Sequence, residues 1–95
     1  MPKGYWIAHI DVQDPETYKL YIENGRAAYE RYNAKFLVRG GRAEVKEGAA
    51  RARNVIVEFN SMEDAVACYN SPEYAKARAF RQKAAISDFI LVEGA

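Results

Sequence analysis

Residues 54–74 read NVIVEFNSMEDAVACYNSPEY, and this stretch decides the fold. Its first part is typical of a buried strand, because β-branched and aromatic residues dominate it and only Glu58 interrupts the apolar run. Ser61 begins a capping-box pattern with the acidic residue three positions later. Ser71 can cap a second helix whose first position is a proline. The stretch therefore predicts a strand that runs into one capped helix and then directly into another.

Upstream, residues 4–12 alternate as a strand with one wholly apolar face and one mixed face. Asp14 can cap the helix that follows, with a proline at its first position. A buried helical stripe continues to Tyr32 at i, i+3, i+4, i+7 spacing. Gly25 lies on this stripe, and we expect it to permit close approach of the helix to the sheet. The stripe comprises Tyr18, Tyr21, Ile22, Gly25, Ala28, Tyr29 and Tyr32.

Between the first helix and residue 54, residues 35–39 form a second predicted strand, and Gly40 and Gly41 follow. The two glycines could make a hairpin turn. We favour a bulge inside one long bent strand, which continues through residues 42–46 and pairs with residues 53–60.

Past the quoted stretch, residues 87–93 predict a last strand. The predicted inward stripes of the two capped helices comprise Met62, Ala65, Val66 and Tyr69 in the first, and Tyr74, Ala77, Phe80 and Ala84 in the second. Cys68 lies beside the first stripe, where we expect it to be a small core residue.

This order of elements predicts one α+β domain over residues 1–95, a ferredoxin-like βαββαβ fold with a broken second helix and an antiparallel four-stranded sheet. Helices that pack on one side of a sheet cover only one of its faces. We expect the apolar residues of each strand to point to that covered face. The remaining face is too apolar to be left in water, so two copies should pair through it and form a dimeric α+β barrel. The open face is expected to carry Tyr5, Ile7, His9, Leu37, Arg39, Ile56 and Glu58.

The chain has 14 basic and 13 acidic side chains, so its net charge gives no electrostatic attraction to nucleic acid or to a membrane surface. No apolar run approaches the ~18 residues of a membrane span. A single cysteine suits a reducing cytoplasm. The chain has no phosphate loop, no dinucleotide fingerprint and no metal-ligand spacing, so we expect neither a cofactor nor a metal.

Two groups of residues are candidates for chemistry. His9, Arg39 and Glu58 should share the mixed sheet face, where histidine and carboxylate could pass a proton and arginine could hold an enolate oxygen. The competing interpretation is that they pair with one another across the dimer interface.

The second group would line a ligand pocket between helix and sheet, with Arg81 beside one or more tyrosines. The alternative is a purely structural role, in which these tyrosines pack in the core with their hydroxyls at its rim. The candidates are Tyr18, Tyr29 and Tyr74.

The chain resembles domain-of-unknown-function family 1330 over essentially its whole length. The matching motifs are GYWIA at 4–8, DPE at 14–16, FLVRGG at 36–41, VEFNS at 57–61, YNSPEY at 69–74 and the segment 81–94. The resemblance implies the dimeric α+β barrel superfamily, and therefore a homodimer. It brings no reaction, because related families include cofactor-free monooxygenases, isomerases and haem enzymes.

Two functions stay open at this point. The chain could be a small-molecule enzyme of the isomerase or cofactor-free oxygenase class, or a non-catalytic homodimeric module that binds a metabolite or serves as a scaffold.

Overall fold

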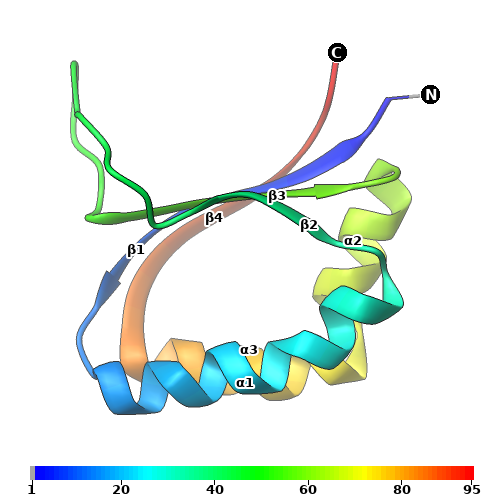
Figure 1. The fold of residues 1–95 in the computed structure, drawn as a ribbon, viewed down its shortest axis with the longest axis horizontal. Coiled ribbons are helices and arrows are strands. Elements are labelled where there is room, and N and C mark those ends of the chain that lie inside the picture. The colour runs from blue at the N-terminus through cyan, green and yellow to red at the C-terminus, as the bar shows by residue number, and fades with distance from the viewer. Residues whose placement is uncertain (1) are drawn as a thin grey trace.

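The computed structural model describes residues 2–95 and has helices on one face of a single antiparallel sheet (Figure 1). The elements follow the predicted ferredoxin-like order, β1 (Gly4–Val12), α1 (Pro15–Arg31), β2 (Lys35–Arg39), β3 (Arg53–Phe59), α2 (Met62–Asn70), α3 (Pro72–Ala84) and β4 (Ala85–Glu93).

The strands lie in the order β2-β3-β1-β4 and every neighbouring pair is antiparallel. The central strand β1 places Trp6 opposite Val57 of β3 and Leu91 of β4. Paired residues point to the same side of a sheet, so these three face the helices. The predicted assignment of the apolar alternation to the covered face is confirmed for β1 and β3.

The three helix starts were predicted correctly. The side chains of Asp14, Ser61 and Ser71 accept hydrogen bonds from the backbone N–H groups of the residues three positions later. Ser71 also donates its hydroxyl proton to the carbonyl of Cys68, at 2.7 Å, so this one buried residue ends α2 and begins α3. The second helix is therefore broken at the predicted position.

The core lies between the sheet and the pair α1 and α3, which run side by side below it (Figure 1). Trp6 is at its centre, in contact with the rings of four aromatic side chains at centroid distances of 4.7 to 5.9 Å. Its indole N–H donates to the carbonyl of Ala65 at 2.9 Å, which ties α2 to the middle of the sheet. Those four neighbours are Phe59, Tyr69, Tyr74 and Phe89.

Cys68 is fully buried in α2, which confirms the expectation of a small core residue. Two expectations about the helix stripes were wrong, because Val66 of α2 and Ile22 of α1 are exposed. Each helix presents only a narrow stripe to the core, so an apolar residue one position away from its centre points toward solvent.

The predicted long bent strand was wrong as well. Beyond Gly40 no strand continues, and residues 41–52 form an irregular segment, the arm, on the sheet side away from the helices (Figure 1). The backbone N–H of Gly40 donates the last hydrogen bond between β2 and β3, to the carbonyl of Asn54. The positive φ of Gly40, 70°, then turns the chain away from β3. Nearly every arm residue is exposed, so a strand there would have had no apolar face to bury.

The bulge is present, but it lies earlier than expected. Phe36 pairs with Val57 and Val38 pairs with Ile56, so Leu37 is an extra residue on β2. The insertion reverses the alternation beyond it. Val38 therefore turns to the open face, and Arg39 turns to the helix side, opposite to the predicted assignment of both.

The face of the sheet away from the helices carries exposed apolar side chains, as the sequence predicts. Ile7 and Ile90 are cross-strand partners with exposed fractions of 40% and 57%. Within residues 2–95, no helix is both long enough and apolar enough to span a membrane.

Candidate functional site

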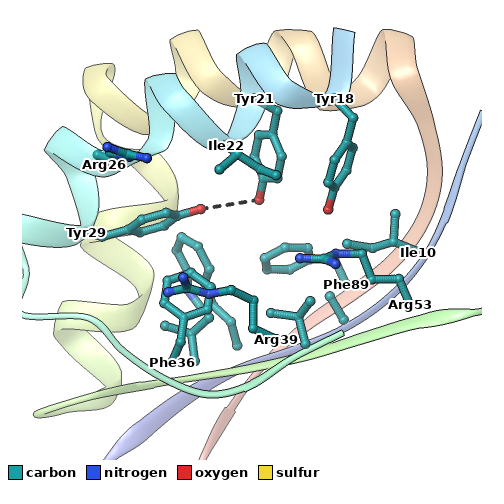
Figure 2. A pocket seen from close by; sticks show the side chains of 14 residues that line it. Ile10, Tyr18, Tyr21, Ile22, Arg26, Tyr29, Phe36, Arg39, Arg53 and Phe89 are labelled. Carbon is teal, nitrogen blue, oxygen red and sulfur yellow. Dashed lines mark hydrogen bonds between the residues drawn. The ribbon is translucent and has the colours of Figure 1, made fainter. Parts of the chain in front are cut away.

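A cavity of about 130 Å³ lies between α1 and the sheet (Figure 2). Its wall comes from α1 and its floor from all four strands. The lining comprises Trp6, Ala8, Ile10, Tyr18, Tyr21, Ile22, Arg26, Tyr29, Phe36, Arg39, Arg53, Val55, Val57 and Phe89. A cavity is therefore present between helix and sheet; of the four residues predicted for such a pocket, Tyr18 and Tyr29 line it, whereas Tyr74 and Arg81 are not in its lining.

Three tyrosines descend from α1 into this cavity (Figure 2). The hydroxyl of Tyr29 donates to that of Tyr21 at 3.4 Å, and Tyr21 shares a hydrogen bond of 2.9 Å with the hydroxyl of Tyr74 on α3. Tyr18 packs its ring against Tyr21 at a centroid distance of 5.3 Å. The hydroxyls thus form a connected chain that runs from the core to the cavity.

Gly25 makes this arrangement possible, although not in the way expected. A side chain at Gly25 would collide first with the ring of Tyr29, 2.9 Å away, and not with the sheet. The glycine therefore makes room for the tyrosine one turn later, whose ring lies across the helix surface and over Phe36 at 5.0 Å.

Burial determines the protonation of these hydroxyls. It raises the pKa of Tyr29 and of Tyr74 far above the usual value, and it raises the pKa of Tyr18 with partial opposition from the guanidinium groups of Arg53 and Arg81. All three are neutral at physiological pH. Tyr18 and Tyr29 line the cavity and can donate hydrogen bonds to an oxygen of a ligand, but as neutral hydroxyls they do not act as bases.

The positive charge at the cavity comes from arginine side chains. Arg39 reaches the cavity because of the bulge at Leu37, and its guanidinium carbon lies 4.0 Å from the ring centre of Phe36. Arg53 enters from the first position of β3, and Arg26 from the exposed side of α1 (Figure 2). Arg81 is buried one layer behind the lining, with its guanidinium carbon 5.0 Å from the ring centre of Phe89.

The other predicted group, on the open face, is not assembled. His9 lies opposite Asn54 and Glu58 lies opposite Tyr5, so the two are four strand positions apart, roughly 13 Å at about 3.3 Å per residue. Arg39 is on the other side of the sheet. A proton relay from His9 to Glu58 with Arg39 as anion holder is therefore absent from the described chain, residues 2–95.

His9 and Glu58 instead have separate partners. His9 Nδ1 accepts a hydrogen bond of 2.7 Å from the backbone N–H of Arg51, and its Nε2 lies 3.1 Å from Asp88. Glu58 accepts a hydrogen bond from the Tyr5 hydroxyl at 3.3 Å. His9 therefore helps to fasten the end of the arm to the sheet.

Sequence reasoning missed three residues of the site. Tyr21 was placed on the buried stripe but was not selected as a candidate, and neither Arg26 nor Arg53 was among the candidates. Arg53 could have been predicted from the alternation of β3. It lies two positions before Val55, so its side chain points to the same, helix-covered face. Among residues 2–95, no group of histidine, cysteine, aspartate and glutamate side chains could hold a metal ion.

The order of the elements and the topology of the sheet define a ferredoxin-like α+β protein. The chain belongs to the family described as domain of unknown function DUF1330, whose match spans residues 3–95.

Solved structures support the same fold. The chain is similar to RPA0582, a protein of unknown function from Rhodopseudomonas palustris, with a TM-score of 0.74 and 20% identity over 97% of this chain and 80% of that one. It is similar to SnoaB, a cofactor-independent oxygenase from Streptomyces nogalater, with a TM-score of 0.61 and 8% identity over 97% and 92%. It is also similar to a dimeric ferredoxin-like protein of unknown function from Bacteroides fragilis, with a TM-score of 0.56 and 12% identity over 96% and 95%. No curated protein matches the chain.

Proposed function

We propose that this protein is a small-molecule enzyme of the isomerase or cofactor-free oxygenase class, with its site in the cavity under α1. The observation that carries the proposal is the chain of hydrogen-bonded tyrosine hydroxyls over an aromatic floor in the cavity. A cavity of 150 Å³ in another protein holds a benzene molecule, so about 130 Å³ suits a single ring.

An isomerisation next to a carbonyl group and the oxidation of a phenol both pass through an enolate or phenolate, and hydroxyl and guanidinium donors stabilise such an oxyanion. The cavity offers these donors from Tyr18, Tyr29 and the arginines around them. The similarity of the fold to SnoaB, described as a cofactor-independent oxygenase, supports the oxygenase branch as analogy.

A second candidate is a non-catalytic module that binds a metabolite. The observation in its favour is that the described lining of the cavity includes no histidine, aspartate, glutamate, lysine or cysteine. A substrate whose own acidity is weak would find no base there.

Ligand-dependent thermal shifts test the proposal. Single-ring phenols, lactones and carboxylates should raise the melting temperature of the wild type. Val55→Phe, which places a ring inside the cavity, should abolish the shift, whereas Val66→Phe on the exposed side of α2 should retain it. If no compound raises the melting temperature, the proposed site is wrong. Oxygen uptake with the compounds that bind then separates the oxygenase from the isomerase, and binding without turnover supports the non-catalytic module.

The protein is further proposed to work as a homodimer joined through the open sheet face, in the cytoplasm, where a reducing environment suits its single buried thiol. Light scattering should give twice the 10.8 kDa of one chain. Ile90→Asp should dissociate the dimer, since Ile90 is the most exposed isoleucine of that face, and Val66→Asp should not. A wild-type mass of one chain would refute the dimer.

A further inference from the structure

The charges around the cavity are unbalanced. Its lining includes Arg26, Arg39 and Arg53, and among residues 2–95 none of the three takes part in an ion pair. Elsewhere in residues 2–95, Arg31 pairs with Glu73 at 2.9 Å and Arg51 with Asp11 at 2.9 Å, whereas Arg42, Arg78 and Arg81 take part in no ion pair. The cavity therefore lies beside three guanidinium groups that no carboxylate of the described residues pairs with.

The two ends of the cavity differ. Arg26 and Arg39 are exposed, and they also line a shallow outer groove that contains Glu30 and Asn33. The carboxylate of Glu30 is therefore near the end of the cavity that Arg26 and Arg39 line. Arg53 is at the other end, outside this groove, and is half-buried.

Arg53 is held in place but incompletely satisfied. Its Nε is buried and has no hydrogen-bond partner. Its guanidinium carbon lies 5.7 Å from the ring centre of Tyr18 and its side chain points toward that residue (Figure 2). It also packs against Gly40, where an added Cβ would collide with the guanidinium. A partly buried guanidinium without a counter-charge is favourable for an anion to pair with, because the pair offsets part of the cost of its burial.

A further charge lies behind this end. Arg81 is 5% exposed, its Nε also lacks a partner, and its guanidinium carbon lies 5.6 Å from the ring centre of Tyr21. Tyr21 lines the cavity, so a second positive charge is one ring away from it. In the low dielectric of the interior, the two guanidinium groups act together to favour a negative group.

We propose that the ligand of this cavity is a single-ring aromatic carboxylate, with its carboxylate bound by the guanidinium of Arg53 and its ring on the floor of Phe36, Trp6 and Phe89. This rests on the proposed function and narrows its ligand class. The volume of about 130 Å³ accommodates one ring. The planar carboxylate matches the fork of an arginine, which binds it through two parallel hydrogen bonds.

Calorimetric titration with benzoate and with its neutral analogue benzamide tests the proposal. In the wild type, benzoate should bind roughly tenfold or more tightly than benzamide, since hydrogen bonds to charged groups are the stronger ones. Arg53→Gln should remove this preference, because it weakens benzoate binding far more than benzamide binding. Arg53→Lys should retain part of it, because the charge stays and the fork is lost. Arg42→Gln, in the exposed arm, is the matched control and should bind both compounds like the wild type. The melting temperature of each variant confirms that it is folded.

The outcomes separate the two proposals. Equal binding of benzoate and benzamide by the wild type overturns the anion inference while the single-ring site stands. A preference for benzoate that survives in Arg53→Gln overturns the assignment to Arg53. If neither these two compounds nor the phenols and lactones bind, both proposals fail.

Discussion

The Tyr74→Phe variant should be less stable than the wild type at neutral pH and at least as stable at high pH. At pH 7 the substitution removes the buried hydrogen bond of 2.9 Å to Tyr21, which costs about 1 kcal/mol. Burial raises the pKa of Tyr74 far above its usual value, so the folded protein keeps this proton while the unfolded chain loses it above about pH 10.

The direction of the pH dependence follows from this difference between the pKa of Tyr74 in the folded and in the unfolded protein. The contribution of the buried hydroxyl is fully present below about pH 10 and is lost as the pH rises further, at up to about 1.4 kcal/mol per pH unit. By pH 11 the wild type should have lost about 1.4 kcal/mol from this residue alone. Phenylalanine has no proton to lose, so the deficit of about 1 kcal/mol at pH 7 should vanish or reverse by pH 11.

Urea unfolding at a fixed protein concentration, followed by the fluorescence of the single tryptophan, measures the free energy of unfolding of both proteins from pH 7 to pH 11. Other groups titrate alike in the two proteins and cancel in the comparison. A deficit that stays the same at pH 7 and pH 11 would mean that Tyr74 ionises in the folded protein, and would refute the role given to its burial.

The remaining predictions concern the core and the helix caps. The thiol of Cys68, whose pKa burial raises to about 12, should react with a thiol reagent at pH 8 only after denaturation, and fast labelling of the folded protein would contradict its burial. Asp14→Ala should cost about 1 kcal/mol and Ser71→Ala about 2 kcal/mol in urea unfolding, because the buried serine also bonds a carbonyl of the preceding helix; equal losses would count against that second role. Trp6→Phe should cost about 3 kcal/mol, since it leaves a space in the core and the carbonyl of Ala65 without its donor, and a loss below about 1 kcal/mol would contradict this.

The parts of the fold that were predictable are those that local chemistry determines. The caps at Asp14, Ser61 and Ser71 act within three residues, so the sequence contains both partners of each. The alternation of β1 and β3 was predictable for the same reason, since period-two patterns refer to one strand at a time.

The site was only partly predictable because its geometry depends on pairing between strands. The position of Arg39 follows from one extra residue at Leu37, and nothing in residues 35–39 alone indicates where such an insertion falls. The role of Gly40 depends on Arg53, thirteen positions later, whose side chain occupies the space beside it. Tyr18 and Tyr29 were predictable as inward residues, but the hydroxyl chain required the relative placement of α1 and α3.

The bulge at Leu37 has a consequence for how such a site changes over evolution. Deleting that single residue would leave Phe36, Val38 and Arg39 opposite the same partners on β3, so Arg39 would stay on the cavity side. Regular pairing with Leu37 retained would instead send Arg39 to the opposite side of the sheet and bring its aliphatic neighbour Val38 toward the cavity. Loss of the bulge without loss of the residue would therefore exchange a cation for a hydrocarbon in one event, without any substitution in the lining.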